Sequence, residues 1–229
     1  VGLSTTGWWS ALHVVDIDFD GDADVLAGNH GENSFFQDDI RLYIKDFDQN
    51  GTLDYFYCVP KDGKYYPIAD RNEIVAQLPG LKKRILYFKD YAEMAIDDLF
   101  SSEELEGVRI LQAEELSSQV FINEGGTFSS RRLPWQLQMS PIYAFATHKI
   151  SEDKIDIFVG GNQYLVKPQF GRFDALPLTI LHLSATEGET VEQTAYFSQI
   201  RDIEVYKIDN DTYVFTASTD DEVEVFKYN

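Results

Sequence analysis

The chain carries the stretch Asp16-Ile-Asp18-Phe-Asp20-Gly21-Asp22-Ala-Asp24, and the same spacing returns in Asp46-Phe-Asp48-Gln-Asn50-Gly51-Thr52-Leu-Asp54. In both stretches oxygen-bearing side chains stand at alternate positions, and a glycine at the sixth position permits a sharp turn. A Ca²⁺ ion takes about six to eight oxygen ligands, so a loop of this kind can surround one ion. The repeated pattern therefore predicts two calcium-binding loops.

An EF-hand is the obvious alternative, because its loop also begins with spaced acidic residues and a glycine. An EF-hand requires a bidentate glutamate at its twelfth position, but that position holds Ala27 in the first loop and Tyr57 in the second. The segments on either side of both loops are short runs of β-branched and aromatic residues, which favour strands over helices. We therefore expect each loop to join the two strands of a hairpin.

The expected ligands follow from the alternation of the pattern. In the first site they are the side-chain oxygens of Asp16, Asp18, Asp20 and Asp24 and the backbone carbonyl of Asp22. In the second site they are the side-chain oxygens of Asp46, Asp48, Asn50 and Asp54 and the backbone carbonyl of Thr52. The alternative is a pair of solvated turns without an ion, because Asp, Asn and Gly also favour turns. Crowded carboxylates repel one another unless a cation is present, so metal binding is favoured, and more strongly at the first loop.

Three segments outside the acidic loops are also distinctive. Gly7–Trp9 precedes the first loop, Gly28–Ser34 follows it, and Gly160–Ala175 lies far along the chain. On these residues the chain resembles the FG-GAP or VCBS repeats of integrin-alpha-type β-propellers, including bacterial proteins related to cartilage acidic protein. It is similar in particular to the large VCBS-repeat proteins of Bacteroidetes. The resemblance implies an all-β fold of propeller blades, an extracytoplasmic location (secreted, cell-surface or periplasmic), and a binding or scaffolding role.

Composition limits the partners. The chain has 229 residues, of which 44% are hydrophobic and 14% aromatic, as in a globular domain with a sizeable core. Its formal net charge of −20 disfavours binding to nucleic acid or to an anionic membrane surface. No stretch reaches the roughly 18 to 20 apolar residues of a transmembrane helix. Because the chain opens on Val1, we expect a targeting segment and further blades to precede it, with self-association as the alternative.

We expect residues 1–229 to form one propeller-type domain or fragment with about three to four blades. The first blade is expected at 7–34, and the second begins at Leu42, is interrupted at 67–107 and resumes at 118–128. A third is expected from Ile142 to Phe197, and a last one from Asp202 to Tyr228.

The interruption at 67–107 has a helical pattern. Asp70 with Glu73, and Ser101 with Glu104, have the spacing of capping boxes, which mark helix starts. We therefore expect a helical insertion within a blade. In the third blade the loop 148–156 lacks the acidic spacing, and it is predicted to bind no calcium.

A second candidate site is the loop at 161–175, which is delimited by glycine and proline residues. Tyr164, Lys167, Arg172 and Asp174 place hydrogen-bonding and charged groups there, and binding groups are often carried by such loops. The alternative is structural, since Arg172 and Asp174 can pair to fix the loop.

Function remains open between classes. We expect a non-catalytic, calcium-binding module for a protein or glycan ligand, without catalytic residues. The alternative is a polysaccharide-acting hydrolase or lyase whose cleft is formed by the helical insertion and the 161–175 loop. A third possibility is an architectural piece of a larger protein without a ligand.

Overall fold

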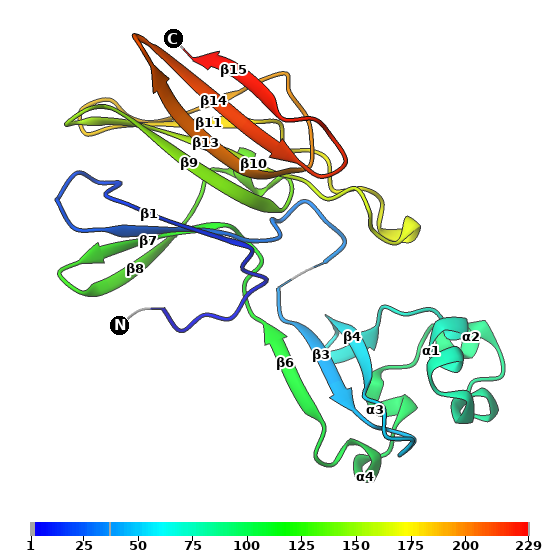
Figure 1. Ribbon diagram of the computed structural model, residues 1–229. Coiled ribbons are helices and arrows are strands. Elements are labelled where there is room, and N and C mark those ends of the chain that lie inside the picture. The colour runs from blue at the N-terminus through cyan, green and yellow to red at the C-terminus, as the bar shows by residue number, and fades with distance from the viewer. Residues whose placement is uncertain (1–2, 37, 229) are drawn as a thin grey trace. The chain divides into compact units, whose positions relative to one another are not determined.

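The computed structural model describes residues 3–36 and 38–228 (Figure 1). The chain divides into two compact units, and the shorter one is nested within the longer one along the sequence. We call Val1–Phe35 with Leu116–Asn229 the blade unit, and Phe36–Glu115 the inserted unit. The expected single domain over the whole chain stays a prediction.

In the described part of the chain, four small antiparallel sheets contain most of the regular secondary structure. The first sheet has the order β1 (Ala11–Val15), β2 (Asp24–Gly28), β7 (Gln119–Glu124), β8 (Thr127–Arg132). The second has the order β5 (Lys64–Pro67), β4 (Asp54–Lys61), β3 (Ile40–Lys45), β6 (Arg109–Ala113). The third has the order β12 (Gly188–Gln193), β11 (Thr179–Ser184), β10 (Lys154–Gly161), β9 (Ile142–Ser151), and the fourth β13 (Ile200–Ile208), β14 (Asp211–Ser218), β15 (Glu224–Tyr228). This mostly-β architecture of blade-like sheets confirms the predicted fold class.

The assignment of residues 118–128 to the second blade was wrong. Val25 pairs with Phe121 and Leu26 with Val120, so β7 and β8 complete the first sheet. The second sheet is completed instead by β6, which the sequence did not suggest as a strand and which pairs with β3. The physical reason is that alternation marks a segment as a strand without identifying its partner. Along the sequence, the second sheet is therefore inserted between β2 and β7, which are neighbouring strands of the first sheet.

The helical region lies between β5 and β6 of the second sheet. Its elements are α1 (Arg71–Gln77), η1 (Pro79–Lys83), α2 (Phe88–Tyr91), α3 (Ile96–Leu99) and α4 (Ser102–Leu105). Both predicted capping boxes are present, with Asp70 capping α1 and Ser101 capping α4. The fully buried side chains of Ile74 and Ile85 join a core with Phe56 of β4, so the helices cover one face of the second sheet.

The three sheets of the blade unit pack in succession. Leu26 and Val120 of the first sheet share a core with Ile157 of the third. On the opposite face of the third sheet, Phe158 shares another core with Val214 of the fourth. The 3-10 helices η2 (Trp135–Gln138) and η3 (Pro168–Phe170) lie in the connections. In the described part of the chain no helix is long and apolar enough to cross a membrane.

A glycine ends β2 of the first sheet and β10 of the third sheet, and an asparagine follows it in both places. A Cβ atom on Gly28 would lie 2.8 Å from the carbonyl oxygen of Ile142, and one on Gly161 would lie 1.8 Å from that of Pro141. The next residue, Asn162, is fully buried and bonds to the backbone of Leu176 in both directions. These pairs allow two chain segments to approach closely and tie the connection to the strand end.

The third sheet differs from the sequence expectation in two places. Most residues of the predicted loop at 148–156 belong to the paired strands β9 and β10. His148 pairs with Asp156, and the hairpin closes with Ser151 opposite Lys154. The last strand of the sheet, β12, ends at Gln193, before Phe197, which was the expected end of the third blade.

Candidate metal centres

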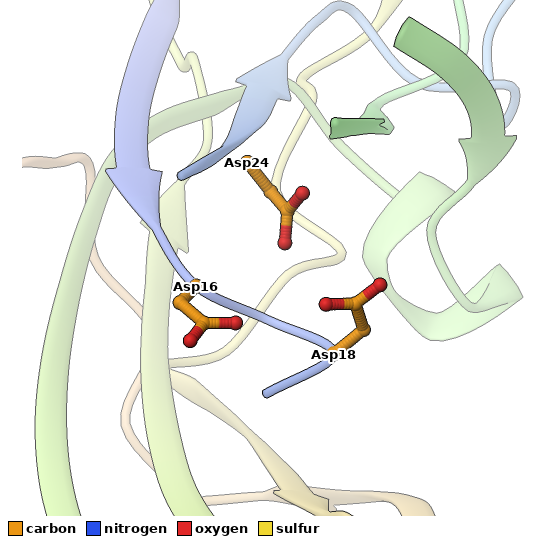
Figure 2. A group of neighbouring side chains, drawn as sticks. All are labelled: Asp16, Asp18 and Asp24. Atoms are coloured by element: carbon orange, nitrogen blue, oxygen red, sulfur yellow. The ribbon is translucent and has the colours of Figure 1, made fainter. Parts of the chain in front are cut away.

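The first acidic loop joins β1 to β2, as predicted, and Asp24 closes it by pairing with Val15. One carboxylate oxygen from each of Asp16, Asp18 and Asp24 lies within 4.8 Å of the others. Figure 2 shows these three carboxylates turned toward one shared space. Asp24 is fully buried and Asp18 is exposed, so the triad spans from the hairpin interior to the solvent.

Hydrogen bonds between side chains and backbone hold this loop. The Gly21 N–H donates to Oδ2 of Asp16 at 3.1 Å, and Gly21 has a φ of +95°, which suits glycine. The N–H groups of Asp20 and Asp22 donate to the aspartates two residues earlier, at 3.2 and 2.8 Å. Asp20, which was expected as a side-chain ligand, lies outside the triad. The expected ligand role of the Asp22 backbone carbonyl stays a prediction.

The second loop joins β3 to β4 and repeats this geometry. Carboxylate oxygens of Asp46, Asp48 and Asp54 lie within 4.8 Å of one another. The Gly51 N–H donates to Oδ2 of Asp46 at 2.8 Å, as Gly21 does to Asp16 in the first loop. Asn50, expected as a ligand, accepts through Oδ1 from the N–H of Thr52. The duplicated sequence thus folds into a duplicated local structure.

The residues of both loops fit a hard cation. Among the described residues, no lysine or arginine forms an ion pair with any aspartate of the two triads. Oδ1 of Asp16 is buried and accepts no hydrogen bond within the same described ranges. Partial burial raises the pKa of Asp18, and repulsion from the carboxylates of Asp24, Asp20 and Asp16 raises it further. The hydrogen bond from the Asp20 N–H acts in the opposite direction. A divalent cation bound to oxygen ligands would neutralise this repulsion.

Within the part of the chain that the structure describes, the first loop has a further connection that the second loop lacks. Oδ1 of Asp24 accepts from the N–H of Asn123 at 2.7 Å, and Oδ2 of Asp22 accepts from that of Gly125 at 3.2 Å. The Asn123 amide in turn donates to the Ala23 carbonyl at 3.2 Å. Sequence reasoning missed this contact, because the segment at 123–126 was identifiable only as a turn.

The 161–175 loop brings together three of the four predicted binding residues. Nε of Arg172 lies 3.7 Å from Oδ2 of Asp174, and its guanidinium lies 3.9 Å above the ring of Tyr164. Lys167 is exposed just before η3. Arg201, on β13, is a neighbour that the sequence did not single out.

The helical region has its own shallow pocket of about 510 Å³, lined by residues 97–101 with Arg84, Glu103 and Glu104. The Arg84 guanidinium makes two hydrogen bonds to the Glu104 carboxylate, at 2.9 and 2.8 Å. Together with the Ser101 N–H they lower the pKa of Glu104 to about 2. A carboxylate that stays ionised near neutral pH is poorly suited to act as a general acid.

Comparison with protein families supplies the remaining observation. A family model described as the FG-GAP repeat matches residues 8–44, a segment that contains the first acidic loop, its hairpin and all but the last residue of β3. No significant match was found among curated proteins or among solved structures. The chain therefore contains an FG-GAP repeat at residues 8–44.

Proposed function

We propose that the protein is a non-catalytic, extracytoplasmic, calcium-binding β-propeller module, related to integrin-alpha-type and VCBS-repeat propellers, that binds a protein or glycan. The observation that carries this proposal is the pair of aspartate triads at equivalent positions of two hairpins. The FG-GAP repeat at the first of them supports it.

The proposed role of the ions is structural. All aspartates of each triad come from one hairpin loop, so an ion links the ends of two strands and removes carboxylate repulsion. An ion that binds the folded chain alone stabilises it by mass action. Extracellular calcium modules have dissociation constants of about 10⁻⁴ to 10⁻³ M, which suits an extracytoplasmic location.

Uncovered apolar faces support the proposal that further blades or a second copy complete the propeller. On β1, Val15 packs against the core while Leu12 and Val14 are 70% and 63% exposed. At the other end of the three-sheet stack, Tyr206 and Val225 are 56% and 49% exposed. Alternation places these side chains on the outer faces of the first and fourth sheets, where a neighbouring blade would bury them.

A calcium titration of chelator-treated protein by calorimetry, with the thermal melt followed in parallel, tests the metal sites. We expect two binding events, and the loss of one in each of Asp16→Ala and Asp46→Ala. Glu152→Gln, which removes one exposed carboxylate in the β9–β10 turn, serves as the control and should keep both. If calcium produces neither heat nor a higher melting temperature, both loops are acidic turns and the proposal is rejected.

A further inference from the structure

Arg201 is a partly buried cation that has no acidic partner among the residues the structure describes. Its guanidinium lies 4.3 Å from the ring centroid of Tyr143, on β9, and Nη1 donates to the carbonyls of Asn162 and Ile200, both at 2.9 Å. No carboxylate forms an ion pair with it in the described ranges, although the chain has 39 acidic residues. Partial burial lowers the pKa of Arg201.

A second arginine and a second tyrosine adjoin this group. The Tyr164 N–H donates to Oε1 of Gln199 at 2.8 Å, which holds the 161–175 loop against the segment leading into β13. The Tyr143 hydroxyl donates to Oε1 of Gln163, the residue before Tyr164, at 2.8 Å, and the Arg172 guanidinium lies 3.9 Å from the centroid of the Tyr164 ring. We call Tyr143, Tyr164, Arg172 and Arg201 the arginine–tyrosine cluster.

The absence of a carboxylate partner for Arg201 among the described residues points to an external ligand. Stacking on a tyrosine replaces only part of the hydration that the cation loses, and two carbonyls accept from only part of a guanidinium's five N–H groups. A partly desolvated cation in a chain of net charge −20 would ordinarily find a carboxylate among its neighbours. Arginine binds carboxylates through two parallel hydrogen bonds, so an external carboxylate would supply the missing partner.

We propose that the arginine–tyrosine cluster binds a sugar residue that carries a carboxylate. Asp174 lies beside Arg172 with its side chain 51% exposed, and its carboxylate can accept hydrogen bonds from sugar hydroxyls. A simple carboxylate ligand has no hydroxyl groups to donate. The tyrosine rings offer apolar surface to the C–H groups of a sugar ring. Because the net charge of −20 repels a dense polyanion, the site fits an isolated acidic sugar in a mostly neutral glycan. This inference rests on the proposed binding function and names its ligand class.

The test uses glucuronate as the probe, titrated by calorimetry or NMR into the calcium-loaded full chain. We expect glucuronate to bind at millimolar concentration, and glucose and acetate to bind at least about tenfold more weakly. Arg201→Gln and Arg172→Gln should each weaken glucuronate binding about tenfold or more. Arg201→Lys, which keeps the charge but not the planar fork, should lose most of that binding. Arg131→Gln, which removes an exposed cation paired with Glu189 at 3.0 Å, should bind like the wild type.

Three outcomes would overturn the inference. Glucuronate does not bind the wild type, or Arg201→Gln and Arg172→Gln both bind glucuronate as tightly as the wild type does, or acetate binds as tightly as glucuronate. Because the Arg172 side chain is 57% exposed, Arg172→Gln keeps the test valid if Arg201→Gln fails to fold. A calcium titration on the same samples separates the two proposals. Retained calcium sites without sugar binding reject this inference alone, whereas absent calcium sites reject the proposed metal-dependent function.

Discussion

The carboxylate of Asp24 accepts a hydrogen bond from the backbone N–H of Asn123 at 2.7 Å, although the two residues are 99 positions apart. Its other oxygen accepts from the N–H of Ile17, within the acidic loop. The corresponding Asp54 accepts from Phe47 of its own loop. The first candidate metal centre is thus joined to the strand that follows the inserted unit, whereas the second is local to one hairpin.

This difference predicts that replacing Asp24 affects the β7–β8 turn as well as calcium binding. In Asp24→Ala the amides of Asn123 and Ile17 lose their acceptor, which costs on the order of 2 to 4 kcal/mol in the stability of the first sheet. Native-state hydrogen exchange at the Asn123 amide measures this effect. Asp54→Ala serves as the matched control and should leave that amide protected. Equal exchange of the Asn123 amide in Asp24→Ala and wild type would contradict the coupling.

His30 predicts a pH dependence. It is only 8% exposed, against the rings of Trp8 and Phe173, and burial lowers its pKa to about 4. The unfolded chain therefore binds more protons than the folded chain between pH 6.5 and about 4, so stability falls as the pH drops through that window. The difference between the ordinary pKa of about 6.5 and the pKa of about 4 in the folded protein corresponds to at most about 3 to 4 kcal/mol.

Urea unfolding at a series of pH values measures this dependence. We expect the free energy of unfolding of His30→Gln to vary less between pH 6.5 and pH 4 than that of the wild type. The difference between the two proteins removes the contribution of carboxylates that titrate in both. Parallel curves for the two proteins would show that His30 has the same pKa in the folded and unfolded states, which contradicts the prediction.

Asn162 predicts a large structural effect outside the metal centres. Its side chain accepts from the Leu176 N–H and donates to the carbonyls of Leu176 and Ser198, all in a fully buried position. Asn162→Ala leaves these groups unsatisfied and should destabilise the blade unit by about 2 to 4 kcal/mol. Denaturant unfolding checks this. Asn33→Ala, at an exposed asparagine with one 3.2 Å bond to the Met139 carbonyl, should cost less than about 1 kcal/mol.

Gly161 predicts a steric effect. A Cβ atom there would lie 1.8 Å from the Pro141 carbonyl oxygen, so Gly161→Ala must displace backbone. We expect the loss of more than about 3 kcal/mol, or no soluble protein. Gly80→Ala, in η1, meets no atom within 4 Å and should be neutral or slightly stabilising in the thermal melt. A similar melting temperature for both variants would contradict the close approach.

Features encoded by nearby residues were predictable from the sequence. The acidic triads, their hairpins and the two capping boxes depend on spacings of a few residues, and each forms as expected. Pairings between distant segments were not predictable. The strand at 119–124 has the alternation of a blade strand, but nothing within it specifies β2 rather than β4 as its neighbour.

The same reason explains why Arg201 escaped the sequence analysis. It stands in a strand without a surrounding motif, and its stacking partner Tyr143 comes from another sheet. Only Tyr164, Arg172 and Asp174 share a loop, and these were the residues that local sequence could group.

The nesting of the inserted unit also affects the order in which the chain can fold during synthesis. The β1–β2 hairpin is made early, but Asn123, which docks on Asp24, follows 99 positions later. At about 5 to 20 residues per second, translation leaves this hairpin without its partner strand for roughly 5 to 20 s. All four strands of the second sheet are made within that interval. The inserted unit can therefore complete its core on the ribosome while the sheet that brackets it still has an open edge.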